Sequence, residues 1–194
     1  MKNLLIAALL GASSLGLATI ATAQSTTPAL TGAMSIAEVG VVPTRGLDGA
    51  GFTAAASDAN RFQIEAGRLA LTRAQRDDVK AYGRRIVSDS ETAQKMLLAS
   101  LENDQRKIAK PSRALSGSRE SMLKLLRNSP KGSFDNLYLT QSAEVQQSAW
   151  ATYKGYAEDG VDQSLKQVAG NGVPLIERQL QDGDALLPSS LAAH

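Results

Sequence analysis

The sequence contains no cysteine, and its one histidine, His194, stands at the C-terminal end of the chain. Without cysteine there is no disulfide, no thiol nucleophile and no iron–sulfur ligand. We expect His194 to fray with the terminus, so a Ser-His-Asp triad, haem ligation by histidine and nearly every zinc site are excluded. The folded part must therefore be held by an apolar core, and any proton transfer would depend on carboxylates.

The sequence also lacks an excess of either charge. There are 21 lysines and arginines against 19 aspartates and glutamates, and the balance is 20 to 19 once the first 23 residues are left out. Proteins that bind nucleic acids need a clear basic excess to contact phosphates. We therefore expect no nucleic-acid partner.

The N-terminal residues carry the pattern of a secretory signal. Lys2 supplies a positive start, residues 4–20 are apolar and uncharged, and small residues follow. The pattern predicts a signal peptide, residues 1–23, that is cleaved between Ala23 and Gln24, and hence export to the periplasm. A retained membrane anchor is the alternative, but the apolar run is short and is interrupted by glycine and serine. We therefore expect no stable membrane span after cleavage.

Apolar residues recur at intervals of three and four along most of the remaining chain, which indicates amphipathic helices. We expect stripes from Phe52 to Leu69, from Val79 to Leu101 and from Tyr138 to Tyr156, and a fourth helix after Gly160 that is interrupted at 170–174. Pro111 should end the second helix, and a short extra helix should form near 120–126, between helices 2 and 3. Alternating β-branched runs are absent, so we predict an all-α, antiparallel four-helix bundle.

The same patterns divide the chain into four parts, of which the signal peptide is the first. Residues 24–50 mix small, polar and turn-forming residues, which predicts a flexible N-terminal tail with at most a short turn around Met34–Val39. Residues 51–187 form the helical domain, and residues 188–194 form a C-terminal tail.

Four sequence blocks occur in order along this domain: "FTAAASDANRFQIEAGRLAL", "DVKAYGRRIVSDSETA", "FDNLYL" and "VPLIERQL". Together they resemble the domain of unknown function 4142 family, a ferritin-like helical bundle of exported bacterial proteins that are often labelled outer-membrane proteins. The resemblance covers residues from about 50 to 187. It implies a ferritin-like fold.

The resemblance also implies a set of site positions on the four helices. The family's asparagine and glutamate match Asn60 and Glu65, and its Asp-His pair falls at Asp89 and Ser90. The histidines of its third and fourth helices fall at Gln146 and Gln179. The family pattern suggests a metal ion held by glutamate and histidine, yet all three histidine positions carry other residues here.

Serine and glutamine are much poorer ligands than imidazole for zinc or iron, and calcium requires more oxygen ligands and more negative charge. We therefore expect no cofactor, and a hydrogen-bonded remnant of a metal site formed by Glu65, Ser90, Gln146 and Gln179. If Glu65 is buried, one of the other three should donate a hydrogen bond to it. The alternative is that Glu65 lies on an exposed face, and we expect Asp89 to be solvated beside Glu91.

The sequence favours a non-catalytic exported protein with a role in binding or in envelope stress. The main alternative is a metal-binding or metal-dependent oxidoreductase or storage protein of the ferritin-like type, and a partner-binding adaptor is a third. A glycosidase-type carboxylate pair among Glu65, Glu144 and Glu177 is not selected by any spacing. The sequence specifies neither a protein partner nor a small-molecule partner.

Overall fold

The computed structural model describes residues 33–102 and 106–188, and over these ranges the chain forms helices and no strand. The helices are α1 (Ile36–Val39), α2 (Gly49–Arg73), α3 (Asp77–Ala99), α4 (Gly117–Asn128), α5 (Lys131–Asp159) and α6 (Gln163–Asp184). The all-α prediction is confirmed for this part. The predicted signal peptide, residues 24–32 and residues 189–194 lie outside the described residues.

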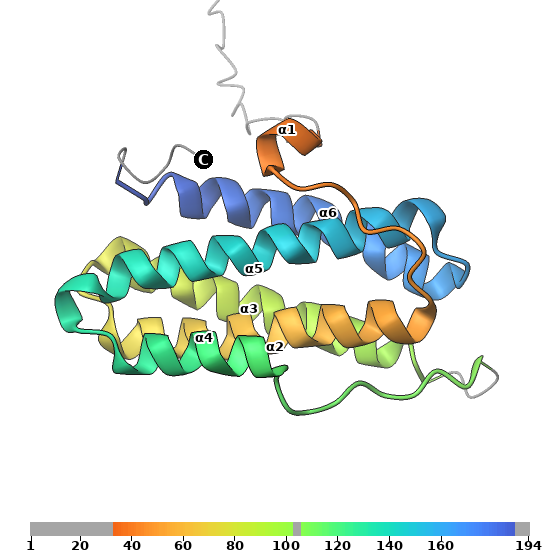
Figure 1. Cartoon of the computed structure of the whole chain (residues 1–194), viewed down its shortest axis with the longest axis horizontal. Coiled ribbons are helices and arrows are strands. Elements are labelled where there is room, and N and C mark those ends of the chain that lie inside the picture. Colours follow the sequence, from red (N-terminus) through yellow and green to blue (C-terminus); the bar gives the residue numbers. More distant parts are fainter. Residues whose placement is uncertain (1–32, 103–105, 189–194) are drawn as a thin grey trace, which may run out of the picture. The chain divides into compact units, whose positions relative to one another are not determined.

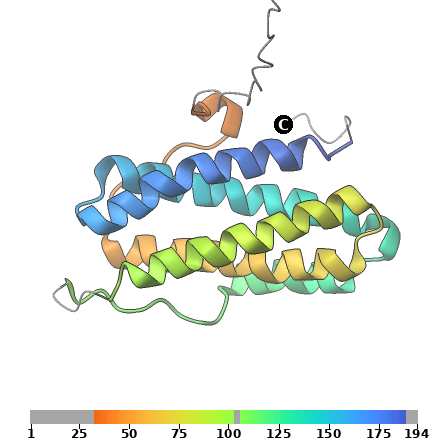
Figure 2. The same cartoon turned by 180° about the vertical axis from the view of Figure 1, so that it is seen from behind.

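The four long helices pack in a closed order. α2 contacts α3 and α5, α5 contacts α6, and α6 contacts α3. Figures 1 and 2 show these helices lying lengthwise beside one another from both sides. The short helix α4, which lies in the connection where an extra helix was predicted, packs against α2 and α5. The contact between α3 and α6 is the least extensive of the four between long helices.

Acidic side chains fix where three of the long helices begin. Asp48 accepts a hydrogen bond from the Gly51 amide at 2.7 Å at the start of α2, and Asp162 accepts one from the Leu165 amide at 2.9 Å at the start of α6. The first amides of a helix have no partner within the helix, so such caps stabilise its end. The start of α3 is capped from another helix, because Asp135 of α5 accepts from the main chain of residues 75 and 76 at 2.9 Å.

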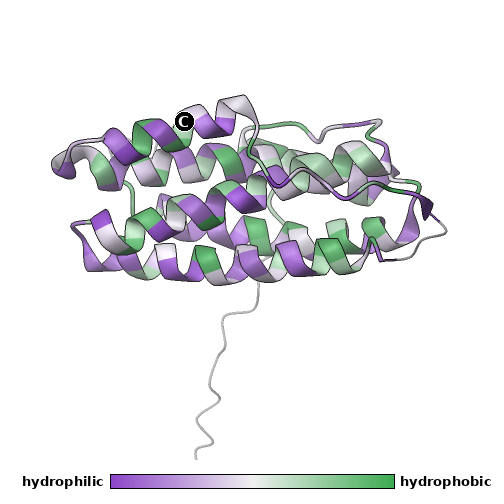
Figure 3. Cartoon of the chain, turned by 90° about the horizontal axis from the view of Figure 1, so that it is seen from below, coloured by the Kyte–Doolittle hydropathy of each residue, from purple (hydrophilic) through white to green (hydrophobic). Residues whose placement is uncertain are grey.

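The core contains every aromatic side chain of the protein. The three phenylalanines, four tyrosines and one tryptophan are each at most 3% exposed. Phe52 stacks on Tyr156 with ring centroids 4.3 Å apart. Each helix also carries hydrophilic residues along its length (Figure 3), and none within the described ranges is long and apolar enough to cross a bilayer.

The predicted interruption of the last helix is wrong. α6 continues from Gln163 to Asp184 with Pro174 inside it. A proline in a helix interior loses one hydrogen bond and crowds the carbonyl four residues earlier, at a cost of about 3 kcal/mol. Here that residue is Gly170, which is exposed on the helix surface. The buried apolar face, which includes Leu165, Ala169 and Leu180, holds the helix together across the proline.

The second helix ends earlier than predicted. α3 stops at Ala99, well before Pro111. The described residues between Leu101 and Pro111 are mostly polar or charged, and Ile108 packs against the core without forming an apolar stripe that would continue the helix. Lys107 has a positive φ of 52°, which is incompatible with a continuing helix.

Residues 33–48, which we name the N-terminal segment, lie against α5. The sequence predicted a flexible tail here, with a short turn around Met34–Val39, and α1 lies within that turn. The segment contains α1, and its Thr44 amide donates to the Ala151 carbonyl at 2.9 Å. The Gly46 amide donates to Asp159 at 3.1 Å. This approach requires Gly155, because a Cβ there would lie within 1.8 Å of the Thr44 carbonyl oxygen. Backbone contacts of this kind leave no pattern in the sequence, which is why the docking was missed.

Candidate functional site

Buried polar side chains connect the long helices inside the core. Ser142 of α5 is fully buried and donates from its hydroxyl to Gln63 Oε1 of α2 at 2.7 Å. Gln63 returns a hydrogen bond from Nε2 to the Ser142 carbonyl oxygen at 2.9 Å. The pair satisfies both halves of the Gln63 amide, as a buried amide requires.

Tyr82 extends these contacts to α3 and α6. Gln146 Nε2 donates to the Tyr82 hydroxyl at 3.0 Å, and the hydroxyl donates to the Gln179 carbonyl oxygen at 3.1 Å. Burial raises the pKa of Tyr82 to about 12, although the hydrogen bond from Gln146 lowers it in part. Tyr82 is therefore neutral at any physiological pH and acts as a hydrogen-bonding junction rather than as a base.

Four of the six predicted site residues border one small cavity among α2, α3, α5 and α6. They are Asn60, Asp89, Ser90 and Gln179, and Gln63 borders the same cavity. The volume is about 30 Å³, which is about the volume that one water molecule occupies in the liquid. Gln179 Nε2 donates to Asp89 Oδ2 at 3.3 Å. Asp89 is half-buried, in contrast to the solvated position expected for it.

Glu65 lies apart from the other predicted residues. Its carboxylate pairs with Arg127 of α4 at 3.1 Å, and its side chain is 38% exposed. The inward position on α2 belongs to Gln63, which is 4% exposed and precedes Glu65 by two residues, or about 200° around a helix. The helical spacing of Ala59, Gln63 and Ala66 was a signal that could have identified Gln63 from the sequence.

The remaining predicted residue, Gln146, is buried but does not border the small cavity. It reaches the cavity through Tyr82 and Gln179, since Tyr82 bonds to both. Gln146, Gln179 and Asp89 thus belong to one chain of hydrogen bonds. Ser90 touches the cavity wall from α3.

Over the described ranges, no three histidine, cysteine, aspartate or glutamate side chains gather closely enough to hold a metal ion. The three glutamates considered as carboxylate catalysts each have a different environment. Glu65 pairs with Arg127, Glu144 is exposed, and the buried Glu177 accepts a hydrogen bond from Trp150 Nε1 at 2.9 Å. The donor set at the small cavity is one carboxylate, amides and a hydroxyl, which does not fit iron, manganese or zinc.

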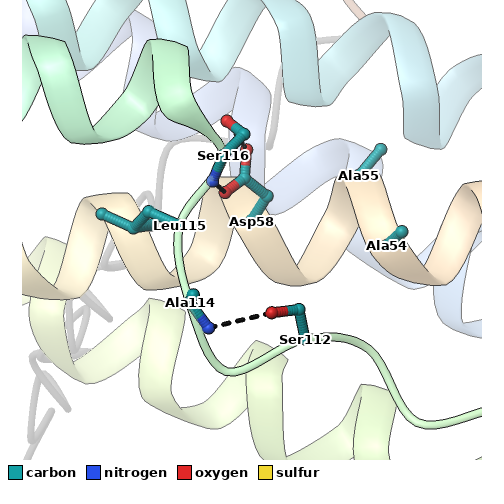
Figure 4. A pocket seen from close by; sticks show the side chains of 7 residues that line it. All are labelled: Ala54, Ala55, Asp58, Ser112, Ala114, Leu115 and Ser116. Carbon is teal, nitrogen blue, oxygen red and sulfur yellow. Dashed lines mark hydrogen bonds between the residues drawn. The ribbon is translucent and has the colours of Figure 1, made fainter.

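A larger hollow lies where the chain before α4 crosses α2, and Figure 4 shows Ser116 facing Asp58 there. Its volume is about 450 Å³. The Asp58 carboxylate accepts from the Ser116 amide at 2.8 Å and from the Ser116 hydroxyl at 2.7 Å. Ser116 is the N-cap residue of α4, so Asp58 holds the start of that helix. Both carboxylate oxygens of Asp58 are therefore used to stabilise the start of α4, which is a structural role.

Over the described residues, these features define an all-helical protein whose long helices are connected in the core by hydrogen bonds among the neutral side chains of Gln63, Ser142, Gln146 and Tyr82. Residues 43–186 match the family described as Domain of unknown function (DUF4142), and the chain belongs to that family. Comparison with curated proteins finds no match, and comparison with solved structures also finds none.

Proposed function

We propose that this chain is an exported, non-catalytic binding protein of the cell envelope, built as an antiparallel four-helix bundle of the ferritin-like type. The closed order of contacts among α2, α3, α6 and α5 supports the bundle. The connections 74–76 and 160–162 are short, which favours antiparallel neighbours. Export and a periplasmic location are supported by the signal-peptide pattern of residues 1–23.

The observation that carries the non-catalytic role is the chemistry of the interior. The hydrogen bonds of Gln63, Ser142, Gln146 and Tyr82 run to one another and to main-chain carbonyl groups. A redox metal would need imidazole or several carboxylates in their place. We infer that this interior is the remnant of a metal site in which amides and hydroxyls have replaced the ligands. A ferritin-like fold alone does not imply ferritin-like chemistry.

A metal titration separates this proposal from a metal-dependent oxidoreductase or storage protein. The chain purified after export is titrated with Zn(II), Mn(II) and, without oxygen, Fe(II), and heat and melting temperature are recorded. We expect no stoichiometric binding tighter than about 1 μM and no rise in melting temperature. Binding at that strength with a ligand excess of about 100-fold over Kd would stabilise the fold by about 2.7 kcal/mol and would overturn the proposal.

A variant with metal ligands added at the small cavity is the matched control. Gln63→Glu, Ser90→His and Gln179→His together place one more carboxylate and two imidazoles around the small cavity, beside Asp89. We expect this variant to gain zinc binding that the natural chain lacks, because the donor types then suit zinc. Circular dichroism at the helical minima checks that it keeps the natural helix content.

A further inference from the structure

A second cavity, of about 200 Å³, lies between α3 and α6, and we name it the α3–α6 cleft. Its wall is largely apolar, with Ala93 and Met96 from α3, Val168 and Leu175 from α6, and Tyr153 from α5. Asp89, Thr92 and Asn171 add polar groups to it. Apolar walls with a few polar groups are the usual composition of a small-molecule site, although 200 Å³ is below the range for drug-sized ligands.

Small residues, Ala93 and Gly172, line the cleft and leave part of the space between the two helices unfilled. Gly172 of α6 lies against the Tyr153 ring, and a Cβ there would come within 2.4 Å of it. Tyr153 is 3% exposed and therefore lines the cleft as a fixed wall. The limited contact between α3 and α6 leaves the remaining space open.

Asp89 stands where three cavities meet. It borders the α3–α6 cleft, the small cavity of about 30 Å³ and a polar cavity of about 320 Å³ that also touches Arg85 and Arg178. Along α3, Arg85 lies one turn before Asp89 on the polar side, and Met96 lies about two turns after it on the apolar side. A ligand in the cleft would therefore have its apolar part near Met96 and its polar end at Asp89.

The carboxylate of Asp89 has no cationic partner within 4.0 Å in the described ranges. Its side-chain hydrogen bond comes from the neutral amide of Gln179, at a long 3.3 Å. The nearby Arg85 pairs with Asp182 instead, at 3.4 Å. A half-buried carboxylate beside an apolar wall attracts a cation more strongly than an exposed one, because water screens it less.

We propose that the α3–α6 cleft binds a small organic cation, with an ammonium group against Asp89 and an apolar body against Met96, Val168 and Leu175. This assignment rests on the binding role proposed above and names its ligand class. It does not depend on whether the interior binds a metal. The two ideas can therefore fail separately.

The test compares three probes of nearly equal shape on the purified chain in the presence of a chelator: the cation 2-phenylethylammonium, the neutral 2-phenylethanol and the anion 3-phenylpropanoate. Binding is followed by amide chemical shifts in two-dimensional NMR. We expect the cation to bind with a Kd near or below about 1 mM, with shifts centred on Asp89, Ala93 and Gly172. The neutral and anionic probes should bind at least about tenfold more weakly.

Two charge variants assign the effect to one residue. Asp89→Asn keeps an acceptor for Gln179 and should weaken the cation about tenfold while leaving the neutral probe unchanged. Glu91→Gln removes the same charge from an exposed position of α3 that pairs with Arg68 at 2.6 Å, and it should leave both affinities unchanged. Ala93→Leu, which fills the cleft, should weaken the cation and the neutral probe together.

Equal binding of cation and neutral probe, shifts remote from the cleft, or no cation binding up to about 10 mM would each overturn the proposal. These outcomes depend only on the natural chain, so they hold even if a variant misfolds. The metal titration is unaffected by them, since the chelator removes metal ions from this experiment. If the cation does not bind and the metal titration also shows no binding, the proposal of a non-catalytic role is unaffected.

Discussion

Tyr82 joins α3, α5 and α6 at a single hydroxyl, and its protonation state should therefore be visible in the stability of the fold. Its pKa is about 12 in the folded chain, against an ordinary value of 10.0, because burial disfavours the phenolate. Burial also raises the pKa of Tyr153 to about 12. Above pH 10 the unfolded chain loses these protons before the folded chain does, so the free energy of unfolding must fall as pH rises from 10 to 12.

The prediction is that Tyr82→Phe makes this alkaline loss of stability less steep. A pKa difference of two units corresponds to about 2–3 kcal/mol for one tyrosine. At pH 8 the variant should be less stable than the natural chain by about 1 kcal/mol, because the hydrogen bonds to Gln146 and Gln179 are lost. Urea unfolding at several pH values between 8 and 11.5 measures both effects. Parallel pH profiles for the two proteins would contradict the role assigned to the hydroxyl.

At the residue scale, four of the six positions singled out from the sequence lie together, and Glu65 does not join them. Asn60, Asp89, Ser90 and Gln179 do border one cavity, while Glu65 faces α4 and Arg127. The rotation of a helix decides which of two nearby polar residues points inward, and a shift of two positions reverses the answer. Gln63 follows the helical spacing of its neighbours, but a resemblance based on residue type favoured the glutamate.

Among the helices, α6 carries an unusual residue for its interior. Pro174 is exposed, lacks the amide that would bond to the Gly170 carbonyl, and yet lies within an unbroken helix. We predict that Pro174→Ala raises the free energy of unfolding by about 1–3 kcal/mol, because the missing hydrogen bond forms and the crowding disappears. Chemical denaturation measures the change.

Pro130→Ala is the matched control for that prediction. Pro130 occupies the N-cap position of α5, where its missing amide breaks no hydrogen bond within a helix. We expect this variant to change the stability by less than about 0.5 kcal/mol. If Pro130→Ala raised the free energy of unfolding as much as Pro174→Ala does, a proline inside α6 would cost no more than one at the start of a helix.

At the element scale, the apolar stripes were sufficient to predict the long helices because most residues of each stripe lie on a buried face, although Ala55 is exposed. Tyr138, Ser142, Val145 and Ala149 are all buried as their spacing predicted. Local rules misjudged the helix ends and the break near Pro174. A proline disfavours a helix locally, but tertiary packing on both sides of it can outweigh that cost, and packing is not visible in a short stretch of sequence.

Over the domain as a whole, the N-terminal segment ties the start of the described chain to residues more than 100 positions later. Thr44 bonds to Ala151, and Gln147 bonds to the Val39 carbonyl at 3.0 Å. We predict that Gly155→Ala displaces residues 41–47 and leaves the long helices in place, because the new Cβ would collide with the Thr44 backbone. Hydrogen exchange read by mass spectrometry should then be faster in residues 33–48 and unchanged in α3.

Gly170→Ala serves as its control, since a Cβ at Gly170 meets nothing within 4 Å. That substitution should leave exchange in the N-terminal segment at the natural rate. Equal exchange in the natural chain and in Gly155→Ala would show that the segment does not depend on the close approach at Gly155.

The arrangement of the whole domain was the part least accessible from the sequence. Periodicity predicts which face of each helix is buried, but not that a cleft remains between α3 and α6 or that the N-terminal segment docks. The docking depends on the absence of a side chain at Gly155, and the close packing of α6 against Tyr153 of α5 depends on the absence of one at Gly172. A glycine in a sequence has many uses, and only the neighbouring backbone or ring shows which one applies.

Trp150 gives the molecule a spectroscopic probe of its own. It is the only tryptophan, it is completely buried in α5, and its indole N–H is bound to the Glu177 carboxylate of α6. Fluorescence excited at the indole band therefore originates from a single known location in the interior. Any event that admits solvent between these two helices will move the emission toward longer wavelengths, so their separation can be watched without dye or label.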